Sequence, residues 1–209
     1  MKIARIGETK RGRFSLFDED DTFLFSVDGE TMAKNKIIEG TEMSLYDLEF
    51  LRTQSDARKA KDQALRYVSM RDYASKELYD KLCLKFDADT SADAVAEMVR
   101  LDLLNDENFA LHRAKYLIRQ KKSVREIERQ LTLKGINKEA IAAVLDTLAP
   151  TDDDACYALL QKSYRTKLLA GDVDKVLAAM ARRGFPYGAA KAAIERFWQE
   201  ESAESESFQ

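Results

Sequence analysis

Apolar residues recur three or four positions apart along most of the chain after residue 57, the spacing that lines one face of an α-helix. One stretch of this pattern returns twice, each time 49 residues further on. Every copy carries an apolar pair four positions apart, namely Leu78 and Leu82, Ile127 and Leu131, and Val176 and Met180. Coincidence explains one such match, but three aligned copies with compatible helices around them indicate an internal repeat.

The ends of the repeated stretches carry helix-termination signals. Each stretch ends in a cation, which suits the negative end of the helix dipole. The second and third stretches then add Gly135 and Gly184, which favour left-handed C-caps. The first stretch lacks this glycine, so its helix must end differently. At the start of the second stretch, Ser123 and Glu126 form a capping box.

Further helices precede and follow each repeated stretch. The preceding helices are expected at 62–71, 106–120 and 152–169, and each begins with an acidic residue. Each unit therefore contains three helices, which bury a small core and stack on their neighbours. We place the three units at the following residues: 57–105, 106–150 and 151–200. The acidic residues 201–209 are expected to form a disordered tail.

Residues 1–56 have a different pattern. Two aromatic-rich runs, 13–17 and 23–27, flank four acidic residues, and this arrangement favours a β-hairpin. Short helices are expected over 31–38 and 44–54. The prediction is a mainly α-helical protein, in which three tandem three-helix repeats follow a small α+β element.

Composition places the chain among ordinary globular proteins. Of its 209 residues, 45% are hydrophobic, which is enough for a core, and the net charge of −3 argues against a general DNA binder. The two cysteines lack the spacing of a metal site. The N-terminus has no signal-peptide pattern, and no apolar run reaches membrane-spanning length. We expect a reduced, cytoplasmic protein without a membrane partner.

Residues that carry catalysis are scarce in this sequence. His112 is the only histidine, and it stands beside Arg113 in a basic helix rather than beside an orienting carboxylate. The sequence contains no phosphate-binding loop, dinucleotide fingerprint or nucleophile elbow. Helix capping and solvation explain the acidic run 152–154 better than a metal site does. We therefore predict no catalytic residue, no cofactor and no metal.

The stretch 113–134 is the most basic part of the chain. It holds eight Lys and Arg residues against Glu126 and Glu128. Such a concentration of positive charge favours phosphates or an acidic protein surface. A solvated helix face with ordinary salt bridges is the alternative. Tyr116 stands alone among these cations and does not make a base-stacking platform.

Two segments of the chain carry a family signature. The first is ALRYVSMR at 64–71, followed by SKEL at 75–78. The second is LNDENFA at 104–110. The segments 125–127 and 134–136 continue the match. In its first two repeats the chain therefore resembles the RecX family, whose members regulate the RecA recombinase.

The resemblance extends from residue 13 to residue 198 and is looser in the third repeat. The acidic tail has no counterpart in the family. The chain also departs from the family pattern in two places. It lacks a glycine before Phe86, and its link at 120–123 is basic where many members carry glycine.

The resemblance implies a non-catalytic RecA modulator. We expect a monomer whose repeats form an elongated, curved array in the groove of the RecA–DNA filament. It would inhibit the recombinase, ATPase and coprotease activities of RecA in DNA repair and the SOS response. The basic residues expected to face RecA or single-stranded or duplex DNA are Arg113, Lys115, Arg119, Lys121, Lys122, Arg125, Arg129, Arg66, Arg71, Lys162, Arg165, Lys167, Arg182 and Arg183.

Two other functions stay open from the sequence. A stand-alone DNA-binding protein would use the same cations without RecA, although the acidic N-terminal segment and tail favour weak intrinsic DNA binding. A structural helical adaptor would instead use an apolar contact surface.

Overall fold

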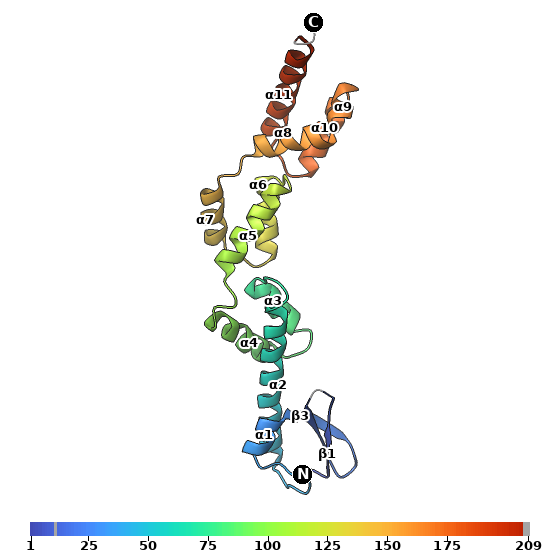
Figure 1. The fold of residues 1–209 in the computed structure, drawn as a ribbon, viewed down its shortest axis with the longest axis vertical. Helices are drawn as coiled ribbons and strands as arrows, with labels where there is room; N and C mark the ends of the chain where they lie inside the picture. The colour runs from blue at the N-terminus through green and yellow to red at the C-terminus, as the bar shows by residue number, and fades with distance from the viewer. Residues whose placement is uncertain (11, 207–209) are drawn as a thin grey trace. The chain divides into compact units, whose positions relative to one another are not determined.

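A three-stranded antiparallel sheet opens the computed structural model, which describes residues 1–10 and 12–206 (Figure 1). The strands follow one another in space and are β1 (Arg5–Glu8), β2 (Arg13–Phe17) and β3 (Phe23–Asp28). β2 and β3 form the predicted hairpin, in which Phe14 pairs with Val27. The sequence pattern does not predict β1, because RIGE is short and has no apolar alternation.

A small apolar core lies under this sheet. Its buried members are Ile3, Leu16, Phe25, Val27, Ile37, Leu48 and Leu51. The short helix α1 (Gly29–Lys34) begins after Asp28, whose carboxylate accepts the backbone N–H of Thr31. The helix expected over 31–38 therefore begins and ends earlier than predicted, and Ile37 beyond its end enters the core.

The long helix α2 (Leu45–Val68) corrects the prediction of two separate helices at 44–54 and 62–71. No glycine or proline interrupts 55–61, and the alanines and charged residues there are strong helix formers. The helix therefore continues without a break. The predicted boundary at residue 56 lies inside it, so the N-terminal element shares this helix with repeat 1.

Repeat 1 continues with α3 (Ser75–Leu82) and α4 (Ala88–Arg100). The side chain of Asp87 caps the start of α4. Residues 83–86, all of which the structure describes, contain no left-handed residue. The N–H of Phe86 instead bonds to a carbonyl in the last turn of α3. This confirms that the helix without a glycine ends differently.

Repeat 2 encloses a core that Ala74, from repeat 1, also enters. Its helices are α5 (Asp106–Arg119), α6 (Val124–Leu133) and α7 (Lys138–Leu148). The repeated apolar pair, Ile127 and Leu131, is fully buried among them. Ser123 caps the start of α6 and Gly135 follows its end with a φ of 83°, as predicted. The reciprocal half of the predicted capping box is wrong, because the carboxylate of Glu126 accepts hydrogen bonds from Arg129 and Gln130 instead.

Repeat 3 encloses its own core. Its helices are α8 (Asp152–Ser163), α9 (Arg165–Leu169), α10 (Val173–Arg182) and α11 (Tyr187–Glu206). The single helix predicted over 152–169 is wrong, because Tyr164 leaves the helical conformation with a φ of −129° and a ψ of 0°. The ring of Tyr164 is buried in the core with Leu160 and Leu168, and this packing separates α8 from α9.

The disordered tail predicted over 201–209 is wrong for residues 201–206, which extend α11. Ion pairs hold this end: Arg196 pairs with Glu200 at 3.0 Å, and Arg165 pairs with Glu201 at 2.9 Å. No helix-breaking residue interrupts the extension. Residues 207–209 of the predicted tail lie outside the described residues.

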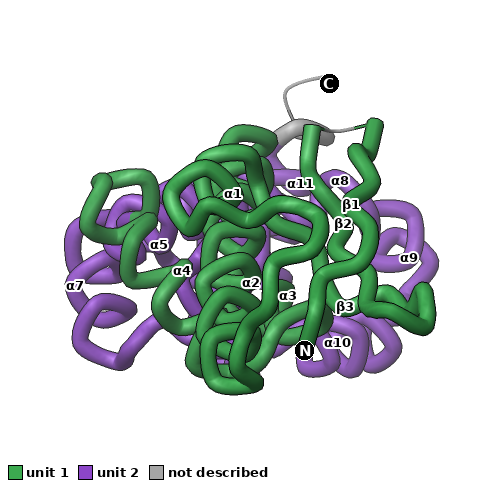
Figure 2. Tube along the Cα trace, turned by 90° about the horizontal axis from the view of Figure 1, so that it is seen from below, with its two compact units in different colours: residues 1–72, 78–104 green, residues 73–77, 105–209 purple. Residues whose placement is uncertain are grey.

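The chain divides into two compact units, which Figure 2 shows in different colours. Unit 1 comprises 1–72 with 78–104, and unit 2 comprises 73–77 with 105–209. The first residues of α3 therefore belong to the same unit as repeats 2 and 3. The expected elongated, curved array stays a prediction.

Candidate functional site

The starts of α3 and α6 are each held by the first helix of the following repeat. The N–H of Ser75 donates to Asp106, with 2.7 Å between N and Oδ1. The N–H of Val124 donates to Asp152 across 2.9 Å. We call the groups around these two bonds the first junction and the second junction, and both lie in unit 2. The acidic residue that opens α5 or α8 thus caps the middle helix of the preceding repeat.

A left-handed glycine completes each junction. Gly135 has a φ of +83°, and a Cβ built on it would lie 2.4 Å from the Cβ of Lys76. Gly184 has a φ of +86°, and its Cβ would lie 2.9 Å from the Oγ of Ser123. The hydroxyl of Ser123 donates to the carbonyl of Arg183 at 2.8 Å. Glycine therefore serves both as the C-cap and as the point of close approach between repeats.

The two junctions differ in their ion pairs. At the first junction, Lys134 Nζ lies 2.5 Å from a carboxylate oxygen of Glu77. The residues 49 positions later are Arg183 and Glu126, and no ion pair joins them among the described residues. The guanidinium of Arg183 lies instead 5.2 Å from the ring centroid of Tyr164.

Glu126 does not pair with Arg183 because its own helix neutralises it. Its carboxylate accepts two hydrogen bonds from Arg129 and one from Gln130, each at 2.8 Å. The hydrogen bonds from Arg129 are the main cause that lowers the pKa of Glu126 to about 2. The carboxylate is therefore charged near neutral pH and already occupied.

A cavity of about 340 Å³ opens at the second junction. Five of the predicted partner-facing residues line it, namely Lys121, Lys122, Arg129, Arg182 and Arg183. The only carboxylate among the described residues of its lining is that of Glu126. The fold thus brings the end of α5, the start of α6 and the end of α10 together around one basic cavity.

Lys121 has an unusual backbone conformation for a lysine. Its φ is +56°, the left-handed region in which glycine normally follows a helix. Its N–H bonds to the carbonyl of Ile118 at 2.9 Å, and the N–H of Lys122 bonds to that of Leu117 at 3.1 Å. These two bonds form a Schellman motif. The basic link therefore keeps the geometry that a glycine would adopt.

Arg113 lies away from the cavity and has a packing role. Its Nη2 donates to the side-chain oxygen of Gln130 at 2.8 Å, which ties α5 to α6. Its guanidinium lies 5.4 Å from the ring centroid of Tyr116. Its Nε is buried without a hydrogen-bond partner in the described structure. The sequence-based prediction ranked Arg113 with the surface cations, because such a tie between two helices leaves no local pattern.

The other predicted cations do not line the cavity. Arg165 pairs with Glu201 in repeat 3. Arg66 and Arg71 belong to unit 1, where Arg71 donates to the carbonyl of Asp72 at 2.9 Å. The remaining predicted cations are exposed on unit 2, and these are Lys115, Arg119, Arg125, Lys162 and Lys167.

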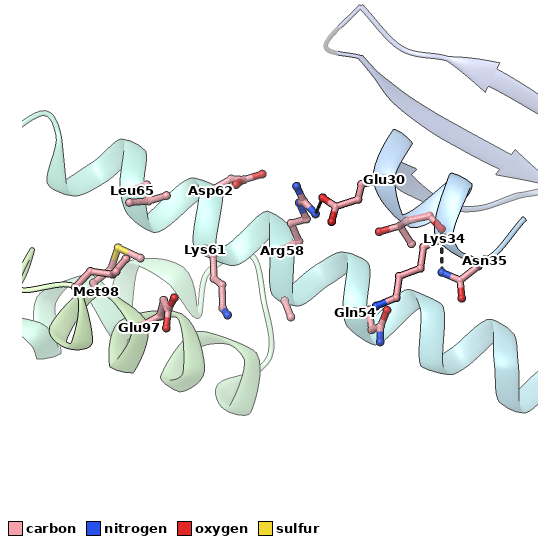
Figure 3. Close-up of a pocket in the computed structure, with 13 residues that line it drawn as sticks. Glu30, Lys34, Asn35, Gln54, Arg58, Lys61, Asp62, Leu65, Glu97 and Met98 are labelled. Atoms are coloured by element: carbon pink, nitrogen blue, oxygen red, sulfur yellow. Dashed lines mark hydrogen bonds and ion pairs between the residues drawn. The ribbon is translucent and has the colours of Figure 1, made fainter. Parts of the chain in front are cut away.

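A second cavity, of about 510 Å³, lies in unit 1 among α1, α2 and α4 (Figure 3). Its lining includes Arg58, which pairs with Glu30 at 2.7 Å, and also Lys61, Asp62 and Glu97. No sequence motif marks these residues. Cations and carboxylates are equal in number around it, so the cavity favours no ligand of one charge sign.

The state of the Cys156 thiol and the spacing of metal-binding residues bear on covalent and metal chemistry in the described part of the chain. Burial raises the pKa of the Cys156 thiol to about 11, so this thiol is protonated at neutral pH. Among the described residues, no three His, Cys, Asp or Glu side chains are grouped to hold a metal ion. No described helix is both long and apolar enough to span a membrane. The absence of catalysis stays a prediction.

Successive helical units that share the same capping bond and glycine contact define a helical repeat protein. Residues 60–98 match the family model described as RecX, first three-helix domain. The chain belongs to the RecX family. It is 32% identical over 157 residues to the regulatory protein RecX of Caldanaerobacter subterraneus subsp. tengcongensis, and the match covers 74% of this chain and 79% of that relative.

Two solved structures support the fold. One, described as the crystal structure of regulatory protein RecX, has a TM-score of 0.64 and 19% identity, and the match covers 93% of this chain and 98% of that chain. The other is RecX from Lactobacillus salivarius, with a TM-score of 0.55 and 25% identity over 68% of this chain and 96% of that chain. The predicted family and the predicted fold class are both confirmed.

Proposed function

We propose that this chain is a non-catalytic regulator that binds the RecA–DNA filament and inhibits the recombinase, ATPase and coprotease activities of RecA. It would do so as a cytoplasmic monomer in DNA repair and the SOS response. A relative of this chain is named a regulatory protein, which supports the regulatory role. The family resemblance points to RecA as the partner.

The basic cavity of the second junction is the observation that carries this proposal. Four of its five cations have no carboxylate partner among the described residues, because Glu126 is held by Arg129. A concave surface lined by one sign of charge concentrates its electrostatic potential. The cavity therefore fits an anionic partner such as DNA within a filament. A regulator shifts the filament only if it binds one filament state more tightly than another.

Measurements on RecA from the same organism test the regulatory role. Purified full-length chain is added to RecA, single-stranded DNA and ATP, and ATP hydrolysis and strand exchange are followed. Both rates are expected to fall at amounts of the chain well below that of RecA. Co-sedimentation with RecA, with and without DNA, tests whether the filament is the target. Unaltered hydrolysis and strand exchange would contradict the proposal.

The same cavity supports a second candidate, a stand-alone DNA-binding protein. This function predicts tight DNA binding without RecA and a steep loss of affinity as salt increases. It also predicts that any effect on RecA arises from competition for DNA. Added DNA in excess would then abolish the effect, whereas inhibition by direct filament binding would persist on filaments that are already formed.

A further inference from the structure

We propose that the cavity of the second junction binds consecutive phosphates of a nucleic-acid backbone through Lys121, Lys122, Arg182 and Arg183. This inference rests on the proposed function, and it names the residues that contact the DNA. It assigns the contact to one junction between repeats rather than to the basic stretch 113–134 as a whole.

The fold gathers positive charge in one place. The four cations come from two parts of the sequence about 60 residues apart and meet around a single cavity. The cavity has about 340 Å³, several times the volume of about 30 Å³ that one water molecule occupies in the liquid, so it has room for phosphate oxygens. Arginine binds a phosphate with two parallel hydrogen bonds, and lysine contributes a mobile point charge.

Lys121 has a backbone conformation that disfavours a side chain. A left-handed backbone is unfavourable for lysine and free for glycine. The Schellman bonds after α5 show that the turn itself requires only the backbone. Lysine therefore stands at this position at a conformational cost, as do Asp21, Lys36, Asp102 and Ala149 outside the cavity. What lysine adds to the turn is a positive charge at the cavity.

The first junction lacks four of the five cations that line the cavity at the second junction. In the 49-residue register, the residues that stand in place of Lys121, Lys122, Arg129 and Arg182 are Asp72, Tyr73, Asp80 and Leu133. The capping bond and the glycine contact are nevertheless present at both junctions. Joining two repeats therefore does not require these cations. Their presence at the second junction is explained by a ligand.

The lining favours a phosphate backbone over an acidic protein surface. The only large apolar side chains among its described residues are Leu159 and Phe185, and Phe185 is 4% exposed. Protein interfaces are usually anchored by accessible aromatic or apolar groups, and the described lining offers only the partly exposed side chain of Leu159. It also contains no exposed aromatic ring for base stacking. The expected contact is therefore independent of base sequence.

Oligonucleotide binding by full-length variants tests this inference. The probe is a fluorescently labelled oligothymidylate without RecA, and anisotropy is measured over a series of salt concentrations. The double variant Lys121→Gly and Arg182→Gln is expected to bind about tenfold more weakly, and its salt slope should be smaller by about 0.7 for each phosphate that it no longer binds. The double variant Lys138→Gln and Lys191→Gln removes the same charge outside the cavity and is expected to bind as the unaltered chain does.

Several outcomes would overturn the inference. One is an unchanged salt slope in the cavity variant, and another is the absence of oligonucleotide binding by the unaltered chain. An equal loss of affinity in a Lys115→Gln and Arg119→Gln variant would assign binding to the whole basic surface. If the cavity variant fails to bind RecA without DNA but keeps its oligonucleotide affinity, the cavity is assigned to an acidic protein surface.

These outcomes are separate from failure of the proposed function. If the unaltered chain leaves ATP hydrolysis by RecA unchanged, the regulatory role fails. The salt slope of oligonucleotide binding then still decides whether the cavity binds phosphates.

Discussion

At the first junction Lys134 pairs with Glu77, whereas at the second junction the corresponding Arg183 faces a basic cavity. Both junctions otherwise use the same parts: a carboxylate that caps the middle helix of the preceding repeat, and a left-handed glycine packed closely against that helix. The residues that join the repeats are therefore not the residues that set the charge.

Substitution of the glycines that both junctions share is expected to cause the largest loss of stability. Gly135→Ala is expected to lower the free energy of unfolding by about 2–4 kcal/mol, because the left-handed backbone is strained and the new Cβ overlaps the stem of Lys76. Urea unfolding followed by circular dichroism measures the decrease. Gly184→Ala is also expected to be destabilising, since its Cβ meets the Oγ of Ser123 at 2.9 Å.

Gly171 provides the matched control for these glycines. It is also left-handed, with a φ of +81°, but nothing lies within 4 Å of its Cβ position. Gly171→Ala is therefore expected to cost about 1 kcal/mol, the conformational part alone. Equal decreases at Gly171 and Gly135 would show that close approach contributes nothing, and the junctions would then lack their common basis.

The difference in ion pairing between the two junctions depends on Glu126. Glu126→Gln removes the charge that holds Arg129 and is expected to cost about 1 kcal/mol at neutral pH, because the pair is partly exposed to solvent. The folded pKa of Glu126, about 2, lies below the ordinary glutamate value of 4.5. Its contribution is therefore complete above pH 4.5 and is lost as the pH falls toward 2. Unfolding free energies measured across this range should fall less steeply in the variant.

Glu128→Gln is the control for that measurement, since Glu128 lies exposed on the same helix. It is expected to leave the unfolding free energy at neutral pH within about 0.5 kcal/mol of that of the unaltered chain. A decrease as large as that of Glu126→Gln would mean that the net charge of α6, rather than the specific pairing with Arg129, stabilises the repeat.

Local signals in the sequence predict most of the fold. The hairpin, the apolar pairs of the three repeats and the caps at Ser123 and Gly135 follow from patterns within a few residues. The errors occur where tertiary packing or helix continuation decides. Burial of the Tyr164 ring breaks one predicted helix, and strong helix formers between residues 54 and 62 join two others.

The cavity is only half visible in the sequence. The basic stretch marks Lys121, Lys122 and Arg129, but it also marks Arg113, which the fold uses to tie two helices. The contribution of Arg182 depends on where α10 ends relative to α6, and these two places are about 60 positions apart in the chain. Lys134 and Arg183 are equivalent in the 49-residue register, so the register indicates that the end of α10 lies near α6. It does not reveal that the carboxylate of Glu126 pairs with Arg129.

The smallest expected change in stability distinguishes the role of Lys121 in the turn from the role of its charge in oligonucleotide binding. Lys121→Gly is expected to raise the free energy of unfolding by about 0.5–1 kcal/mol, because glycine adopts the left-handed conformation without strain and the Schellman bonds are kept. Ala149→Gly relieves the same kind of strain at a φ of +39° outside the cavity, and it should stabilise the chain similarly. Only Lys121→Gly should also weaken oligonucleotide binding. If Lys121 only supported the turn, the Lys121→Gly variant would not be both more stable and weaker in oligonucleotide binding. If Lys121→Gly instead destabilises the chain, the lysine side chain supports the turn, and its presence in the left-handed conformation then needs no ligand.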